Sequence, residues 1–277
     1  FILYLICQSV GIFAYNLIIA KTADKKYPSM CKKNIEPLDN KSKNELFKNI
    51  KALVIIKIGG VLVNSTDNII ISSIKGLAIT GLNSNYTLLI NTLNSIVSQV
   101  FNGITASVGN LNAIETKEKK QYIFKVINFL NFWLFAWCTI SFVILANDII
   151  SICFGSRYLL GNSIVAISAI NFYVVGMQNA VWTYKTTMGL FDYGKYLVFG
   201  TGVINIILSI ILGKQWGLFG ILLATFISRA VTNVWYDPYA VFKYGFANNP
   251  LEYFWTYVKY AIIAIITFCI TNWCARI

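Results

Sequence analysis

Two residues of opposite charge, Lys57 and Asp67, lie within a segment that is long and apolar enough to cross a membrane. The segment, 53–73, also contains Asn64 and Asn68. A charge at bilayer depth costs roughly 2.5–3.5 kcal/mol, so such residues usually face a water-filled cavity or a partner. Helical spacing predicts that the four side chains form one polar stripe, which would suit the wall of a hydrated passage. Alternatively, the helix is shorter, with Asp67 among the headgroups and Lys57 extending to the opposite interface.

Two more basic residues, Arg229 and Lys185, lie in or beside apolar segments. Arg229 falls inside the segment 217–235. A guanidinium group makes two-pronged contacts with phosphate, so Arg229 together with Lys57 would suit a phosphorylated cargo. The competing interpretation is that Arg229 reaches the inner headgroups. Lys185 follows the apolar segment 163–184 and is either an interfacial anchor or a candidate entry contact for an anionic headgroup.

A third apolar segment, 78–107, carries a row of polar residues along its length. They are Tyr86, Thr87, Asn91, Asn94, Ser98 and Asn102. Such a row either binds sugar hydroxyls or joins helices through hydrogen bonds. The substrate-binding candidates along the predicted passage are therefore Lys57, Asn64, Asp67, Tyr86, Asn94 and Arg229.

Residues for catalysis or metal binding do not form a recognisable pattern. The sequence contains no His, and its six Cys residues form no C-x-x-C pair. It also lacks paired carboxylates, a glycine-rich phosphate loop and a nucleophile triad. We therefore expect no catalytic residues, no metal site and no resident cofactor, although a coupling ion such as Na⁺ or H⁺ is compatible with the buried charges.

Composition places the chain among polytopic membrane proteins of the all-α class. Hydrophobic residues make up 57% of the 277, and charged residues only 12%, about half the usage of soluble domains. A membrane span needs about 20 mostly apolar residues. About eight segments meet this condition: 1–20, 52–73, 78–107, 123–146, 163–184, 196–212, 217–235 and 257–274.

The distribution of basic residues predicts the orientation of these spans. Lys and Arg in short loops remain on the cytoplasmic side. Of the 23 basic residues, 17 fall on one side of the predicted topology and four on the other, and Lys57 and Arg229 lie within spans. The net charge of +12 is thus mainly an orientation signal. Binding to nucleic acid is not expected, because no soluble basic domain is present to carry it.

The same pattern predicts three regions. Residues 1–20 would be the last helix of an N-terminal bundle, 21–51 a basic cytoplasmic linker, and 52–277 a C-terminal transmembrane bundle. With eight spans both ends would lie outside the cell. Since intact carriers usually begin and end in the cytoplasm, we expect further helices at each end of a longer protein.

Several stretches resemble the oligosaccharide-lipid flippases of bacterial capsule and O-antigen synthesis. This family belongs to the multidrug/oligosaccharidyl-lipid/polysaccharide exporter superfamily. The similar stretches are 57–89, 154–196, 204–229 and 234–246, and they include NIILS followed by GLFGILLAT. Together they cover most of residues 50–250. The order of the stretches makes the resemblance more specific than any one of them.

The resemblance implies a helical transporter of about 12–14 spans in the bacterial cytoplasmic membrane. Such transporters move an undecaprenyl-diphosphate-linked oligosaccharide between leaflets by alternating access, and charged residues of the lumen take part. By position this role extends to Lys57, Asp67 and Arg229. The expected partners are membrane lipid, the polyprenyl-diphosphate-linked oligosaccharide and a polysaccharide polymerase.

Two other functions remain open at this point. One is another exporter of the same superfamily, such as a peptidoglycan-precursor flippase or a drug exporter. An exporter of cationic drugs would be expected to have a more acidic cavity than two buried cations and one anion. The other is a membrane glycosyltransferase or polymerase of the same pathway, which would need catalytic groups on sizeable outer loops.

Overall fold

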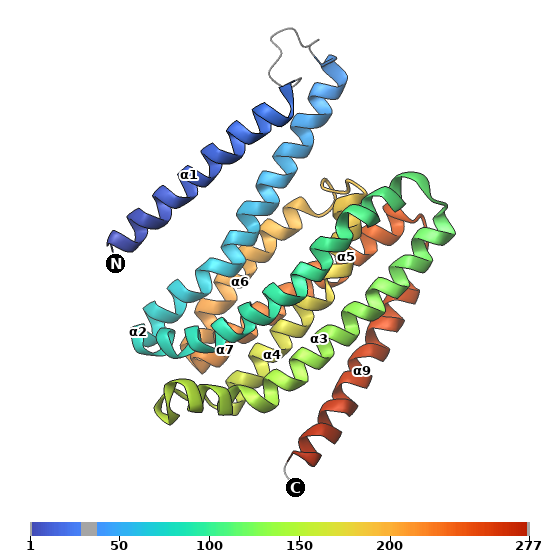
Figure 1. Ribbon diagram of the computed structural model, residues 1–277. Helices are drawn as coiled ribbons and strands as arrows, with labels where there is room; N and C mark the ends of the chain where they lie inside the picture. Colours follow the sequence, from blue (N-terminus) through green and yellow to red (C-terminus); the bar gives the residue numbers. More distant parts are fainter. Residues whose placement is uncertain (1, 29–37, 276–277) are drawn as a thin grey trace. The chain divides into compact units, whose positions relative to one another are not determined.

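Long apolar runs with few prolines favour long helices in this chain. A computed structural model describes residues 2–28 and 38–275, except for the side chain of Asn64 (Figure 1). The elements are α1 (Ile2–Lys26), α2 (Asn40–Ile114), α3 (Lys117–Phe154), the 3₁₀-helix η2 (Ser156–Tyr158), α4 (Asn162–Met177), α5 (Asn179–Thr187), α6 (Lys195–Trp216), α7 (Leu218–Val231), α8 (Asn233–Ala240), the π-helix η3 (Val241–Gly245) and α9 (Leu251–Cys274). No strand occurs among the described residues, so the predicted all-α class is confirmed.

Six helices are long and apolar enough to cross a membrane. They are Ile2–Lys26, Lys117–Phe154, Asn162–Thr187, Lys195–Trp216, Leu218–Gly245 and Leu251–Cys274. Each contains one of the predicted spans or most of it. The two remaining predictions, 52–73 and 78–107, fall within α2 and stay predictions, as does the total of eight.

The helix α2 is divided by a sharp turn at Gly76. Its φ of 83° and ψ of 169° lie outside the helical region, in a conformation that strongly favours glycine. The chain doubles back at this point without an intervening loop (Figure 1). The two limbs of α2, 40–75 and 77–114, therefore carry the two predicted spans separately.

Contacts divide the chain into residues 1–47 and 48–277. Within the first unit, α1 buries none of its residues. Helix α1 ends at Lys26 and α2 begins at Asn40, so the predicted linker 21–51 is partly helical. The division at 47 and 48 lies close to the predicted start of the C-terminal bundle at residue 52.

Helices of the second unit pack around two main cores. One core joins aromatic residues of α3, α5, η3 and α9, where the ring of Phe124 meets Tyr184 and Phe242 edge to face at 5.1 and 5.3 Å. The other joins both limbs of α2 to α3, α4 and α7. Helices α3 and α4 pack closely at Gly176, because a Cβ atom there would lie 2.0 Å from Cδ1 of Phe135.

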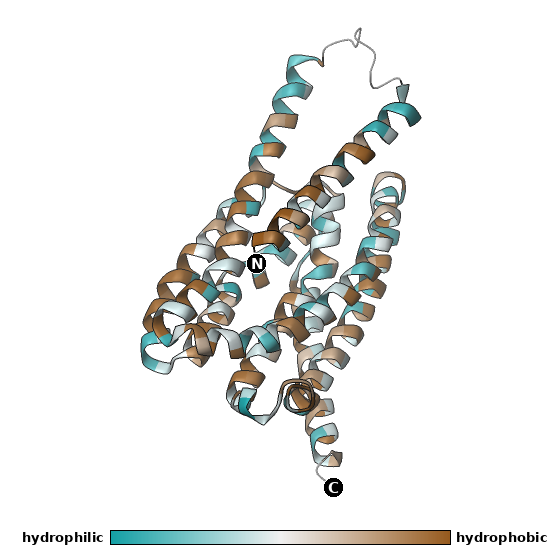
Figure 2. Cartoon of the chain, turned by 60° about the vertical axis from the view of Figure 1, so that its left-hand side comes forward, coloured by the Kyte–Doolittle hydropathy of each residue, from teal (hydrophilic) through white to brown (hydrophobic). Residues whose placement is uncertain are grey.

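Large apolar side chains also cover the outside of this bundle. Trp133 and Trp137 on α3 and Ile262 and Ile265 on α9 are each at least half exposed. Hydrophobic residues run along the lengths of the helices, and hydrophilic residues gather mostly near their ends (Figure 2). An apolar outer surface of this extent is the surface that lipid covers in a membrane protein.

Candidate functional site

Two of the apolar helical segments are interrupted near their middles. Residues at each interruption form hydrogen bonds with neighbouring helices. The first separates α4 from α5 at Gln178, and the second separates α7 from α8 at Thr232, where φ is −117° and ψ is −87°. The freed carbonyl of Gly176 accepts a hydrogen bond from Nδ2 of the fully buried Asn131 at 3.0 Å. Side-chain donors of this kind satisfy backbone groups that a broken helix leaves open.

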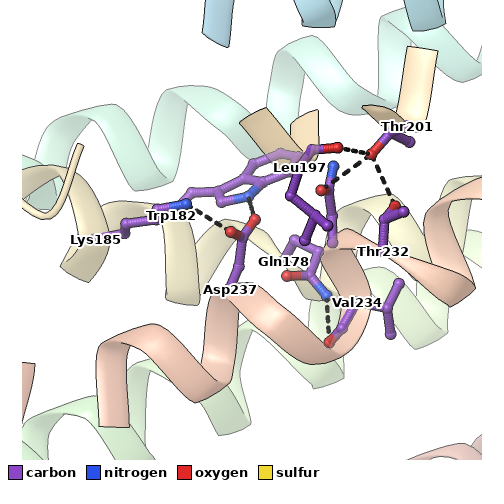
Figure 3. A network of polar contacts seen from close by, with 9 residues as sticks. Gln178, Trp182, Lys185, Leu197, Thr201, Thr232, Val234 and Asp237 are labelled. Carbon is purple, nitrogen blue, oxygen red and sulfur yellow. Dashed lines mark hydrogen bonds and ion pairs between the residues drawn. The ribbon is translucent and has the colours of Figure 1, made fainter. Parts of the chain in front are cut away.

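A buried ion pair joins α5 to α8 just beyond these two breaks. The Lys185 Nζ lies 2.6 Å from Oδ1 of Asp237, and the two side chains are only 9% and 4% exposed. The indole N–H of Trp182 donates to the other carboxylate oxygen at 3.0 Å. Figure 3 shows both side chains of α5 directed at Asp237. Both oxygens of the Asp237 carboxylate are therefore partnered.

A second set of polar contacts fixes the break at Thr232 against α6. The hydroxyl of Thr201 donates to the hydroxyl of Thr232 at 2.8 Å (Figure 3). The same hydroxyl lies 3.2 Å from Oδ1 of Asn233. Thr201 and Thr232 are both buried. Side-chain hydrogen bonds thus hold the segment at the point where the regular backbone hydrogen bonds of the helix are interrupted.

Asp67 joins the first limb of α2 to α7. The hydroxyl of Thr225 donates to Oδ2 of Asp67 at 2.8 Å and accepts a hydrogen bond from Nδ2 of Asn205 at 3.0 Å. The guanidinium group of Arg229, one turn further along α7, interacts electrostatically with the Asp67 carboxylate. A charged network therefore links three helices across the bundle.

Three buried oxygen atoms, two of them on residues that bond to Thr225, have no hydrogen-bond partner among the described residues. They are Oδ1 of Asp67, Oδ1 of Asn205 and Oγ of Ser209. Asn205 and Ser209 are four residues apart on α6 and share a face. Carboxylate, amide and hydroxyl oxygens are hard ligands, which suit small hard cations better than soft metals. The described residues contain no cluster of three or more His, Cys, Asp and Glu residues that could hold a metal ion.

A cavity of about 300 Å³ lies between α2, α5, α6, α7 and α8. Its polar wall is formed by Trp182, Lys185, Arg229, Asn233 and Asp237, and the first limb of α2 contributes an apolar wall. Two cations and one anion line it directly, which leaves an excess of positive charge. The cavity could therefore accommodate a small anionic or strongly polar group within an otherwise apolar bundle.

The structure brings together two of the residues predicted from the sequence, Asp67 and Arg229, and places Lys57 elsewhere. Lys57 is exposed and is not part of the cavity wall. Ten residues of α-helix place Asp67 about 80° around the axis from Lys57. The expectation of one continuous polar stripe is therefore corrected: Asp67 faces α7, whereas Lys57 and Asn68 lie on exposed positions. The side chain of Asn64 lies outside the described residues.

Tyr86 joins helices through hydrogen bonds, which is one of the two roles expected for the polar row, and it does not line the cavity. Its side chain is 1% exposed. The hydroxyl donates to Oδ1 of Asn147 at 2.6 Å and accepts from the backbone N–H of Leu160 at 3.0 Å. Tyr86 thus connects α2 to α3 and to the loop before α4, away from the cavity. Asn94 is half-buried on the second limb of α2 and also lies outside the cavity wall.

Lys185 is not an exposed interfacial anchor in this structure, and its role as an entry contact for an anionic headgroup stays a prediction. Its ammonium group is buried because Asp237 compensates its charge. Sequence reasoning missed Asp237, since the span was expected to end at Trp235 and Asp237 to lie in a loop. A usable signal was present: an acidic residue directly before Pro238, within a mainly apolar and aromatic stretch. The helix instead continues through Ala240 and then as η3 to Gly245.

Comparison with protein-family models, with curated proteins and with solved structures finds no match for this chain.

Proposed function

We propose that this chain forms part of a membrane transporter that carries an anionic, lipid-linked saccharide from one leaflet to the other. The observation that carries this proposal is the cavity beside Arg229, Lys185 and Asp237. Ionised side chains inside membrane bundles are expensive and commonly mark the path of a polar substrate. The sugar and diphosphate of the cargo would enter hydrated space in the bundle, and the polyprenyl chain would remain in lipid.

The charges of the cavity favour an anionic cargo over a cationic drug. Arg229 and Lys185 outnumber Asp237 in its wall. Lys185 is held by Asp237 at 2.6 Å, whereas the forked guanidinium group of Arg229 can make two-pronged contacts with phosphate, so Arg229 is the cation better suited to a diphosphate. Arg229 would exchange part of its interaction with Asp67 for the phosphate oxygens when the cargo arrives.

The unpartnered oxygen atoms of Asp67, Asn205 and Ser209 suggest a means of energy coupling. A cation such as Na⁺ would be held by Oδ1 of Asp67, Oδ1 of Asn205 and Oγ of Ser209, which have no hydrogen-bond partner among the described residues. Because Asp67 also interacts with Arg229, cation binding at Asp67 would weaken its hold on the guanidinium group. Cargo and cation would then be linked through one carboxylate.

The interrupted helices provide points at which the bundle could rearrange. Transporters commonly place their substrate sites beside discontinuous helices and rock one part against another. Here Trp182 and Asn233, which follow the two breaks, line the cavity, and the Lys185–Asp237 pair joins the half-helices α5 and α8. We expect these two half-helices to move as one body.

The direct test replaces Arg229 in the complete protein and measures transport in cells. In Arg229→Gln, lipid-linked saccharide should accumulate in the inner leaflet and surface polysaccharide should fall, because the charge that captures phosphate is lost. Arg229→Lys should retain only part of the activity, since Lys lacks the two-pronged contact. Arg157→Gln is the matched control, because Arg157 lies exposed in η2, outside the cavity.

Two results would contradict the proposal. Normal surface polysaccharide in a stably expressed Arg229→Gln variant would remove the cavity from the transport path. Loss of saccharide synthesis, with no accumulated lipid-linked intermediate, would indicate an enzyme of the same pathway instead.

A further inference from the structure

A second polar pocket lies at the start of α9, away from the charged cavity. It has a volume of about 230 Å³, and its wall includes Phe124, Asn128, Phe242, Tyr253 and Tyr260. Helices α3 and α9 lie side by side (Figure 1) and supply most of these residues. A water molecule occupies about 30 Å³, so the pocket has room for a group of several heavy atoms.

An exposed ion pair forms part of the wall of this pocket. The Lys125 Nζ lies 2.5 Å from Oε1 of Glu252, and both side chains are more than half exposed. Exposed pairs of this kind contribute roughly 0–1 kcal/mol, so an incoming ligand can replace the contact readily. Lys125 and Glu252 thus offer one positive and one negative partner.

Two residues of the pocket wall carry buried polar atoms without partners among the described residues. The atoms are Oδ1 of Asn128 and the hydroxyl of Tyr253, and each of these residues is only 3% exposed. Buried polar atoms are nearly always hydrogen-bonded, so two unpartnered atoms on residues of one pocket wall point to a ligand or to water. Asn128 Oδ1 can only accept, so its partner must carry an N–H or O–H group.

Aromatic rings make up much of the remaining wall and favour a cation. The rings of Phe124, Phe242 and Tyr253 meet within 5.3–6.1 Å of one another. Aromatic faces attract ammonium groups. A primary ammonium has three donors, and the pocket offers three acceptors: Asn128 Oδ1, the Tyr253 hydroxyl oxygen and the Glu252 carboxylate. Lys125 would then be available to bind a phosphate.

We propose that this pocket binds the headgroup of a phosphoethanolamine lipid, with its ammonium group inside and its phosphate on Lys125. The position of the pocket supports a lipid source, because Lys125 and Glu252 lie near the ends of two segments that could span the membrane. The lipid would join α9 to α3, where α9 buries only Tyr253 of its own residues. The proposal is independent of transport, because it concerns a different pocket and a different ligand.

The experiment measures lipid binding to the purified full chain by native mass spectrometry. Phosphatidylethanolamine, its mono- and dimethylated forms, phosphatidylcholine and phosphatidylglycerol are added separately at equal concentration. Occupancy should fall stepwise as N–H donors are replaced by methyl groups. The loss from phosphatidylethanolamine to phosphatidylcholine should be tenfold or more, since hydrogen bonds to a charged group contribute about 1.5–3 kcal/mol each.

Variants locate the binding to this pocket. Tyr253→Phe keeps the ring and removes the hydroxyl, and Asn128→Leu keeps similar bulk and removes the acceptor. Each should reduce the preference for phosphatidylethanolamine by about tenfold. Glu252→Gln should do the same through loss of charge. The matched control is Glu115→Gln, which breaks the Glu115–Lys119 pair at 2.6 Å, near the start of α3 and outside the pocket.

Three outcomes would overturn the proposal. Equal binding of the five lipids would mean that the pocket holds only water. A preference that survives in Tyr253→Phe, the mildest of the variants, would place the site elsewhere. Equally tight binding of soluble phosphoethanolamine would identify a metabolite site and remove the membrane lipid.

Discussion

The ammonium group of Lys185 and the carboxylate of Asp237 form a 2.6 Å ion pair across 52 residues of sequence, and water reaches neither group to any large extent. Burial of two charges is tolerated here because each compensates the other and Trp182 satisfies the second carboxylate oxygen. The arrangement is therefore most sensitive to the loss of a single partner.

We expect Lys185→Met to destabilise the protein by about 3–5 kcal/mol, because it leaves the Asp237 carboxylate buried without its counter-charge. The Lys185→Met, Asp237→Leu double variant should recover most of this loss, since no charge remains to be solvated. Thermal unfolding in detergent and protein abundance in the membrane would measure both effects. If the double variant lost more stability than the two single variants lose together, this account of the pair would be contradicted.

Gly176→Ala should destabilise the contact between α3 and α4 by about 1–3 kcal/mol, because the added methyl group would overlap the ring of Phe135. Gly81→Ala is the matched control: Gly81 is also helical, and a Cβ atom there meets nothing within 4 Å. The control should be neutral or slightly stabilising, since Ala favours helix more than Gly does. Equal losses in the two variants, measured by thermal unfolding, would rule out the steric explanation.

Sodium should raise the melting temperature of the protein relative to choline at equal ionic strength, because Na⁺ would satisfy the oxygens of Asp67, Asn205 and Ser209. At ten times Kd the stabilisation would be about 1.4 kcal/mol, which corresponds to a few degrees. Asp67→Asn should abolish the effect while it keeps an acceptor for Thr225. Asp148→Asn, an exposed carboxylate on α3, should leave it unchanged. A sodium effect that persists in Asp67→Asn would place the cation at another site.

Asp192 should make the stability of the loop before α6 depend on pH. Its carboxylate lies 2.8 Å from Lys195 and 2.5 Å from Lys48, and hydrogen bonds from these two residues lower its pKa. A carboxylate with a lowered folded-state pKa contributes stability above its unfolded pKa of about 3.9. This contribution is lost as the pH falls through the folded value. Limited proteolysis of the loop should therefore accelerate in strong acid in the wild-type protein and depend less on pH in Asp192→Asn.

Local sequence is sufficient to predict the all-α class and to single out several charged residues within apolar segments. Arg229 and Asp67 stand out because they interrupt apolar runs, and the structure places them in one network. Lys185 stood out for the same reason, but its partner Asp237 lies on a helix that continues past the expected end of a span. The prediction of a single polar stripe was wrong because Lys57 and Asp67 point in different directions around the helix axis. Their spacing alone does not show which direction faces a neighbour; packing against α7 decides that Asp67 does.

Tyr86 illustrates a different limit of sequence reasoning. A tyrosine among polar residues on an apolar helix fits a sugar site and a structural contact equally well. The choice depends on Asn147 and Leu160, which are more than 60 residues away and meet Tyr86 only in the folded bundle. The turn at Gly76, by contrast, falls in the gap between the predicted spans 52–73 and 78–107, but the φ of 83° that joins the two helices without a loop follows from the path of the chain.

The sparse burial of α9 has a consequence for biosynthesis. Apart from Tyr253, this helix contributes no buried residue, so the two main cores are nearly complete without it. A ribosome delivers α9 after every other described helix, and the earlier helices can associate in the membrane while it is still being made. Among the described helices, α9 would therefore dock onto neighbours that are already packed, and errors in its insertion would spare the charged cavity.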